Sequence, residues 1–374
     1  MKKIVFITGT RADFGKLKPL IQAVEKSLCF EAYIFATGMH MLPYYGSTVH
    51  EILKCNFKNI YIYNNQAFQL GMDISLANTI YGFSCYVKEL NPDLVIVHGD
   101  RSEALAGAIV SSFNNVRIGH IEGGEISGNI DGLIRHSITK LSHAHFVANK
   151  KAKERLLQMG ESDCSIFVIG SPEVDFMLSD KLPCLELVEK SYGINFDNYA
   201  ILIYHPVTFE KDKFVENTKE IVSAILESEM NYIVILPNND SKSQIIEAEY
   251  NRLRESSKCK VFPSIRFECF MTLLKHSKFI IGNSSTGIRE APVFGVPSIN
   301  IGSRQTGRSD HESIFNINED KDKILEVIIL TSEHGIHFKS CSRFGDGKSV
   351  EHFIDILREG LIWSLPIQKV FEER

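Results

Sequence analysis

Short apolar runs recur along the first half of the chain, and helix-length amphipathic segments separate them. The runs are rich in β-branched residues and occupy 3–8, 31–37, 59–63, 93–98, 116–121 and 144–148. Helical periodicity is clearest at 15–27 and 102–113. Strands that are apolar on both faces and alternate with helices are typical of a parallel sheet covered on both sides. The pattern predicts a doubly wound α/β domain.

The alternation starts again in the second half of the chain. Its apolar runs occupy 165–170, 199–205, 232–237, 260–262, 278–283 and 296–302. Residues 181–198 are interpreted as an irregular connector, because Pro, Gly and Asn lie near its ends. We therefore predict two Rossmann-like domains, over 1–170 and 171–350. A helical pattern that Pro366 interrupts predicts a C-terminal helix over 351–374, which returns to the first domain.

The composition fits two domains and argues against several classes of protein. The 374 residues exceed the size at which one hydrophobic core usually keeps growing. A net charge of −5 gives no reason to expect a nucleic-acid partner, and the densest basic run, 150–155, is interpreted as the solvated face of a helix. No apolar run approaches the ~20 residues of a membrane span, and Arg11 interrupts the first run before a signal peptide would be complete. A cytoplasmic protein without a membrane partner is expected.

The loops and cysteines narrow the choice of cofactor. The eight cysteines form neither a C-x-x-C pair nor a Cys/His spacing suited to zinc, so we expect reduced thiols and no metal. The first loop, 8–16, carries glycine and opens a helix but lacks G-x-G-x-x-G, which weakens a dinucleotide interpretation. The start of a helix still favours an anion, and Arg11 adds a fixed positive group there.

Carboxylates lie near the ends of two neighbouring strands in the first half, where open parallel sheets collect their ligands. Asp100 follows the run 93–98, Glu122 follows the run 116–121, and Asp131 precedes a helical pattern. Asp100 and Asp131 each suit a helix cap, but together the three carboxylates favour general acid–base chemistry. His120 and Glu122 share strand parity and are therefore predicted to face the same side.

Residues 119–132 gather Glu122, Glu125 and Asp131 in a glycine-rich loop, and the next basic residue is Arg135. We expect the missing positive charge on the second domain, together with a bound diphosphate. Glu125 is interpreted as a solvent-facing carboxylate. The glycines are expected to let the backbone approach the substrate.

The second half carries groups that suit an anion. His205 ends an apolar run, and Asn239 precedes a helical pattern. Ser284 and Ser285 end another run at a helix start, where hydroxyls and the helix dipole favour a phosphate. Glu290, placed inside that helix, would accept a hydrogen bond from a ribose diol.

Arg304 follows the next run and is interpreted as a clamp on a phosphate or on a loop. The second half thus carries hydroxyls, amides and a cation, whereas the first half carries carboxylates. This division predicts a nucleotide diphosphate on the second domain. Its attached group would then meet the acids and bases of the first. This is the layout of an enzyme that acts on a sugar nucleotide.

The chain resembles one family through an ordered set of motifs from about residue 4 to residue 308. The motifs are ITGTRADFGKLKPL, HGDRSEALA, GHIEGGEISGNIDGLIRHSITKLSHAHFVA, YHPVT, LPNND and GNSSTGIREAPVFGVPSINIGSRQTGR. They resemble the hydrolysing UDP-N-acetylglucosamine 2-epimerases of bacterial sialic acid synthesis and the epimerase half of the bifunctional animal enzyme. The resemblance implies two Rossmann-like domains that face each other across a cleft, as in glycosyltransferase B, with no cofactor and no metal. It also implies a homo-oligomer, a dimer or a tetramer.

The implied reaction converts UDP-N-acetylglucosamine and water into N-acetylmannosamine and UDP. UDP is eliminated to give a 2-acetamidoglucal, and water then adds with inversion at carbon 2. By resemblance, Arg11, His205, Ser284 and Ser285 lie on the phosphate side, and Glu290 contacts the ribose. Proton transfer and activation of water fall to Asp100, in elimination, and to Glu122 and Asp131, chiefly in hydration.

Other functions stay open on sequence alone. A hydrolysing epimerase of UDP-N,N'-diacetylbacillosamine, in legionaminic acid synthesis, shares the motifs. A non-hydrolysing epimerase usually has G-T-R-P-E in the first loop and H-x-E-A-G in the carboxylate loop. This chain has Gly-Thr-Arg-Ala-Asp at 9–13 and His-Ile-Glu-Gly-Gly at 120–124, which favours hydrolysis. A glycosyltransferase or a silent UDP-sugar sensor would show no proton exchange at carbon 2.

Overall fold

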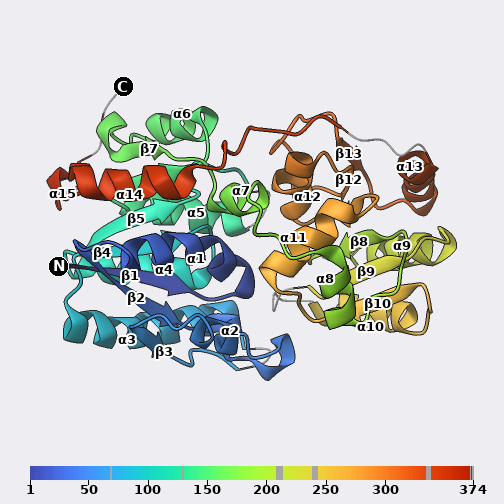
Figure 1. Cartoon of the computed structure of the whole chain (residues 1–374), viewed down its shortest axis with the longest axis horizontal. Coiled ribbons are helices and arrows are strands. Elements are labelled where there is room, and N and C mark those ends of the chain that lie inside the picture. The colour runs from blue at the N-terminus through green and yellow to red at the C-terminus, as the bar shows by residue number, and fades with distance from the viewer. Residues whose placement is uncertain are drawn as a thin grey trace. The chain divides into compact units, whose positions relative to one another are not determined.

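The chain divides into two compact units in the computed structural model (Figure 1). The structure describes residues 1–67, 70–127, 130–207, 214–237, 243–333, 338–370 and 372. Unit 1 comprises Met1–Glu125, Asp131–Ser179 and Arg343–Arg374, and unit 2 comprises Ile126–Ile130 and Asp180–Ser342. Within the described residues, no helix is long and apolar enough to cross a membrane.

A seven-stranded parallel sheet forms the centre of unit 1, with the order β3-β2-β1-β4-β5-β6-β7. Its strands are β1 (Lys2–Thr8), β2 (Phe30–Ala36), β3 (Ile60–Ile62), β4 (Leu94–His98), β5 (Arg117–Ile121), β6 (Ala144–Val147) and β7 (Ile166–Val168). Its helices are α1 (Arg11–Glu25), α2 (Val49–Leu53), α3 (Met72–Leu90), α4 (Ser102–Phe113), α5 (Ile130–Leu141), α6 (Lys150–Gln158), α7 (Pro172–Met177), α14 (Ser349–Glu359) and α15 (Leu361–Ser364). The strand order reverses between β1 and β4, so the loops after these strands border the switch point at which such sheets bind ligands.

Unit 2 contains a six-stranded parallel sheet with the order β10-β9-β8-β11-β12-β13. Its strands are β8 (Ala200–Ile203), β9 (Tyr232–Ile235), β10 (Cys259–Phe262), β11 (Ile280–Gly282), β12 (Ser298–Ile301) and β13 (Ile314–Ile317). Its helices are α8 (Leu185–Tyr192), α9 (Phe214–Glu227), α10 (Ser243–Arg254), α11 (Phe267–His276), α12 (Thr286–Arg289) and α13 (Lys321–Glu333). The switch point lies between β8 and β11.

A glycine allows β11 to approach β8 closely at that switch point. Gly282 has φ +130°, and a Cβ built on it would lie 1.9 Å from the carbonyl oxygen of Ile203. Another residue would clash there with backbone, which cannot move away as a flexible side chain can. The close approach of the Ile203 backbone therefore requires glycine at position 282, independently of any ligand.

The predicted fold class is confirmed, since each unit is a parallel sheet with helices between its strands. Three details of the prediction are wrong. The run 165–170 forms β7, which pairs with β6 and ends the first sheet instead of opening the second. The predicted irregular connector contains α8, which buries Val188 and ends at Gly193 with φ +63°. Strand β13 was not predicted.

The C-terminal segment belongs to the core of unit 1. Phe353 of α14 is fully buried, and its ring centroid lies 4.9 Å from that of Phe146. Lys369 pairs with the buried Glu161 at 2.5 Å and donates hydrogen bonds to backbone carbonyls at the end of α5. Burial raises the pKa of Glu161, but its hydrogen bond with His145 and its charged neighbours outweigh that effect and lower this pKa to about 2. The segment is thus held by apolar packing and by a buried ion pair.

Candidate active site

Asp100 and Glu122 lie just beyond the carboxyl ends of the neighbouring strands β4 and β5. Glu122 is buried and has φ +66°, in the left-handed region that residues other than glycine rarely adopt. Its backbone N–H donates to Phe146 on β6 at 3.1 Å. The strand geometry therefore ends at Ile121, and the parity argument that placed His120 and Glu122 on one side does not extend to Glu122. Such strained backbone is often found at functional sites.

Arg135 joins the two carboxylates. It lies on α5 with only 2% of its surface exposed, and its guanidinium forms an ion pair with Asp100. It also donates to the backbone carbonyl of Glu122 at 2.6 Å and lies 3.8 Å from the Glu122 carboxylate. Asp131 occupies the first turn of the same helix, one turn before Arg135, so the two share a helix face. Asp100 and Glu122 are thus grouped around one buried cation, and Asp131 lies one helical turn before it in the sequence.

Lys16 provides a second cation from α1. Its ammonium nitrogen lies 3.1 Å from Oε1 of Glu122 and 3.3 Å from Oε1 of Glu173. On β4, Nε2 of His98 lies 3.4 Å from the same Glu122 oxygen. The prediction that these acids lack positive partners within their own domain is therefore wrong. Lys16 lies far from the carboxylate loop in the sequence, and the fold brings them together.

One interpretation of the carboxylate loop is corrected. Glu125 is 5% exposed and so is not a solvent-facing carboxylate. Gly124 has φ +73°, and a Cβ there would lie 2.3 Å from the carbonyl oxygen of Ala152. This glycine therefore permits close packing of the loop on α6, and its carbonyl accepts a hydrogen bond from Arg155 at 3.0 Å. The expected approach of the loop backbone to a substrate stays a prediction.

His120, which the sequence placed on the same side as Glu122, makes hydrogen-bond contacts with neighbouring protein groups. Its Nε2 lies 2.8 Å from the carbonyl oxygen of Gly99, and its Nδ1 lies 3.3 Å from the Thr139 hydroxyl. Burial is the main cause that lowers the pKa of His120 to about 3. The ring is therefore neutral near neutral pH, and it ties the turn before Asp100 to β5.

Arg11 is the first residue of α1, and its position is fixed by a capping box. Thr10 accepts a hydrogen bond from the Asp13 backbone N–H at 3.2 Å, and the Asp13 carboxylate accepts from the Thr10 backbone N–H at 2.9 Å. The Arg11 guanidinium pairs with Glu51 at 2.5 Å. Part of its charge is thus engaged within unit 1.

In unit 2, the buried Asn283 fixes the backbone around His205. Its side chain accepts from the His205 N–H at 2.7 Å and donates to the His205 carbonyl at 2.9 Å. The backbone carbonyl of Asn283 accepts from Arg304 at 3.1 Å and from Gln305 at 2.8 Å. Arg304 therefore clamps a loop, one of the two roles predicted for it, and that loop is the one after β11. These bonds connect the segments that follow β8, β11 and β12.

Ser284 and Ser285 follow β11 and are partly buried. Ser285 is the N-cap of α12, which has only four residues. A helix this short contributes little of the predicted dipole, and the hydroxyls and backbone N–H groups remain as anion donors. Glu290 is 3% exposed and caps the end of α12, so its predicted place inside a helix is wrong. Asn239 lies outside the described residues.

A sequence profile described as UDP-N-acetylglucosamine 2-epimerase matches residues 22–358. The chain belongs to this family. A UDP-N-acetylglucosamine 2-epimerase of Neisseria meningitidis serogroup B is 44% identical over 374 residues, which are 99% of each chain. A hydrolyzing UDP-N,N'-diacetylbacillosamine 2-epimerase of Legionella pneumophila is 32% identical over 96% of each chain.

The fold is shared with solved structures. The UDP-GlcNAc 2-epimerase of Methanocaldococcus jannaschii, in complex with UDP-GlcNAc and UDP, matches 96% of this chain and 100% of its own with a TM-score of 0.82. The sequence identity is 24%, so this likeness concerns the fold. The resemblance to the epimerase family that the motifs indicated is confirmed.

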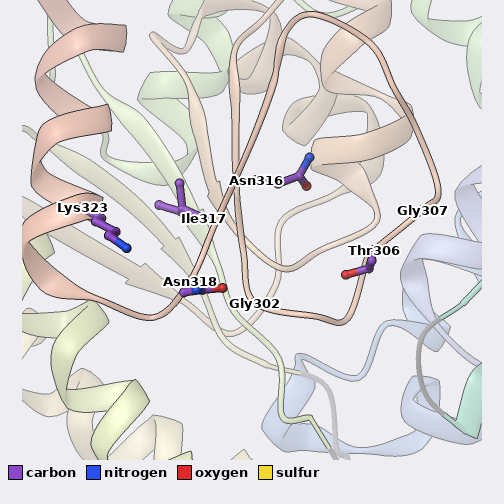
Figure 2. Close-up of a pocket in the computed structure, with 7 residues that line it drawn as sticks. All are labelled: Gly302, Thr306, Gly307, Asn316, Ile317, Asn318 and Lys323. Atoms are coloured by element: carbon purple, nitrogen blue, oxygen red, sulfur yellow. The ribbon is translucent and has the colours of Figure 1, made fainter.

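A pocket of about 420 Å³ lies in unit 2 of this family member, at the carboxyl ends of β12 and β13 (Figure 2). It is lined by Gly302, Thr306, Gly307, Asn316, Ile317, Asn318 and Lys323. Figure 2 shows Lys323 on α13 and Thr306 on the loop that carries Arg304, pointing inward from opposite sides. Of the predicted phosphate-side residues, His205, Ser284 and Ser285 follow β8 and β11, Arg11 begins α1, and none of the four lines this pocket.

Lys16, Arg135 and Asn283 are the important residues that sequence reasoning did not assign. Lys16 lies within the first motif, Arg135 within the third and Asn283 within the last, so each belongs to a quoted motif but was given no role. Their partners come from other elements, and a single sequence does not show which elements meet. For Arg135 the sequence offered a signal, because this Arg lies on the buried, partly apolar face of α5, where an arginine is expected only with a partner.

Proposed function

We propose that the chain is a hydrolysing UDP-N-acetylglucosamine 2-epimerase. The reaction would convert UDP-N-acetylglucosamine and water into N-acetylmannosamine and UDP, and so supply sialic acid synthesis. The observation that carries the proposal is the pair Asp100 and Glu122 held by one buried Arg135, in a chain 44% identical to an epimerase of Neisseria. Carboxylates fixed at strand ends suit the proton transfers at carbon 2 that this reaction needs.

In the first step, the bond between carbon 1 and the UDP oxygen breaks and UDP leaves with the electron pair. The proton on carbon 2 is not acidic in the substrate, so departure of UDP leads and builds positive character on the sugar. Asp100 would then take the proton, which gives a 2-acetamidoglucal. Donors in unit 2, namely His205, Ser284 and Ser285, would stabilise the leaving diphosphate, with Arg11 of unit 1.

In the second step, water adds to carbon 1 and a proton is returned to carbon 2 from the opposite face. Glu122 and Asp131 would share this step, one by activating water and one by donating the proton. Arg135 and Lys16 hold Glu122 in one orientation, which lowers the cost of aligning it with the intermediate. Glu290, Arg304 and Asn239 keep their proposed role in binding the UDP part.

The test uses heavy water. The protein is incubated with UDP-N-acetylglucosamine in D₂O, and the products are followed by proton NMR. Free N-acetylmannosamine with deuterium at carbon 2, together with released UDP, is the expected result. A UDP-sugar that keeps its nucleotide would identify a non-hydrolysing epimerase, and an unlabelled sugar would contradict proton exchange.

A second candidate is hydrolysis of UDP-N,N'-diacetylbacillosamine. The observation that favours it is the 32% identity to the Legionella enzyme over nearly the whole chain. The same experiment with this substrate compares the two values of kcat/KM. A value at least about tenfold higher, or 1.4 kcal/mol in transition-state stabilisation, would assign the substrate.

A further inference from the structure

Glu173 is an acid of unit 1 to which the proposed mechanism gives no role. It lies on the short helix α7, with 1% of its surface exposed. Its Oε1 lies 3.3 Å from the ammonium of Lys16, which also lies 3.1 Å from Oε1 of Glu122. One buried cation therefore stands between two buried acids.

The position of Glu173 is fixed by contacts that α7 makes with other elements of unit 1. Pro172 begins α7, and the Asp175 carboxylate accepts from the backbone N–H groups of Ser349 and Val350 at 2.9 and 2.8 Å. Helix α7 also packs against α1, which carries Lys16. Because its own surface is almost entirely covered, Glu173 acts on a substrate through another residue, and Lys16 is a residue that it contacts.

We propose that Glu173 is a positioning residue that shares the Lys16 ammonium with Glu122. An ammonium placed between two carboxylates holds each less tightly than it would hold one alone. Lys16 thus orients the Glu122 carboxylate while leaving it able to exchange a proton. This role rests on the proposed function, in which Glu122 takes part in hydration.

The charged and titratable groups that face Glu122 come from several elements. Among the described residues they include Lys16 from α1, His98 from β4 and Arg135 from α5, with Glu173 of α7 and Asp100 after β4 acting through Lys16 and Arg135. Removal of the Glu173 charge strengthens the hold of Lys16 on Glu122. Glu122 then becomes harder to protonate, so its titration moves to lower pH.

The experiment compares Glu173→Gln with Glu173→Asp and with a matched control, Asp175→Asn. Asp175 is an acid of the same helix whose carboxylate accepts from α14. For Glu173→Gln we expect kcat to fall about tenfold, KM to change less than about twofold, and the limb of the kcat profile set by Glu122 to move down by about half a pH unit or more. Glu173→Asp restores part of the rate, and Asp175→Asn lowers the Tm without moving the limb.

A second readout does not depend on turnover. Glutamate labelled with ¹³C at the side-chain carboxyl is titrated by NMR, and Glu122 is assigned by difference from Glu122→Gln. A lower midpoint for Glu122 in Glu173→Gln supports the sharing of Lys16 even if the wild type releases no UDP, which would refute only the proposed function. An unchanged midpoint, or a pH profile that superimposes on the wild type after correction for folded protein, overturns the inference.

Discussion

At the residue scale, the carboxylate cluster combines charges that attract with a backbone conformation that costs free energy. Glu122 adopts φ +66°, which costs of the order of 1–3 kcal/mol for a residue other than glycine. Its side chain lies near Lys16 and Arg135, which oppose the mutual repulsion of neighbouring acids. The strain and the ion pairs are both local, and together they place one carboxylate at the end of β5.

Asp131→Asn separates the two proposed chemical steps. The substitution removes a group assigned to hydration and leaves Asp100 in place, so we expect overall turnover to fall about 10²-fold or more while UDP release falls less. The 2-acetamidoglucal should then escape, and proton NMR would detect its vinylic proton at carbon 1. Normal turnover without detectable glucal would mean that Asp131 serves only the start of α5.

Arg135→Gln removes the cation that Asp100 and Glu122 share. Because uncompensated buried charge is costly, the free energy of unfolding should fall by about 3 kcal/mol, as measured by urea denaturation. Arg135→Lys keeps the charge but loses the fork geometry, so it should restore only part of the loss. Lys153→Gln, which breaks a partly exposed pair with Asp163, serves as the control with an expected loss below about 1 kcal/mol. Equal losses for Arg135→Gln and the control would contradict the bridging role.

At the element scale, the proposed site residues of each unit lie on loops that a few buried groups hold together. In unit 2, Asn283 connects the segments after β8, β11 and β12. The strands that carry these loops could be predicted, because β-branched runs identify them. Strand β13 escaped prediction, since Asn316 interrupts its apolar run. The four-residue length of α12 depends on Pro292, which follows closely in the sequence, and on packing that no local pattern shows.

Asn283→Ala tests this gathering of loops. The substitution removes two short hydrogen bonds to the His205 backbone and leaves those buried groups unpaired, at about 1–3 kcal/mol each. We expect affinity for UDP to fall at least about tenfold by calorimetry, with a lower Tm. Asn231→Ala removes an exposed hydrogen bond to Asn198 and should change neither quantity measurably. An unchanged UDP affinity in Asn283→Ala would mean that the loops joined by Asn283 are not part of the proposed UDP site.

At the scale of the whole molecule, much of the fold was predictable and the interactions of the site were less so. Asp100 and Glu122 were chosen correctly as neighbours because parallel strands bring their carboxyl ends to one edge of a sheet. Lys16 and Arg135 were left without roles because their partners depend on how α1 and α5 pack. The burial of Glu125 was missed for the same reason.

Buried histidines make the stability of the fold depend on pH. Burial lowers the pKa of His40 to about 4 and that of His120 to about 3, below the 6.5 of an exposed ring. At a pH between the lowered pKa of each ring and 6.5, the unfolded chain binds more protons than the folded chain. The free energy of unfolding therefore falls as pH decreases below 6.5. Each ring contributes a slope of up to about 1.4 kcal/mol per pH unit. Urea titrations between about pH 7 and pH 5 measure it, and His40→Gln or His120→Gln should reduce it. An unchanged slope in both variants would contradict this account.

The return of residues 343–374 to unit 1 has a consequence for biosynthesis. Domains tend to fold as the ribosome releases them, beginning at the N-terminus. Here most of unit 2 is continuous from 180 to 342 and can become compact while unit 1, although made first, still lacks α14 and the ion pair of Lys369. Premature termination before residue 349 would therefore damage the earlier-made, carboxylate-bearing unit and spare the later one.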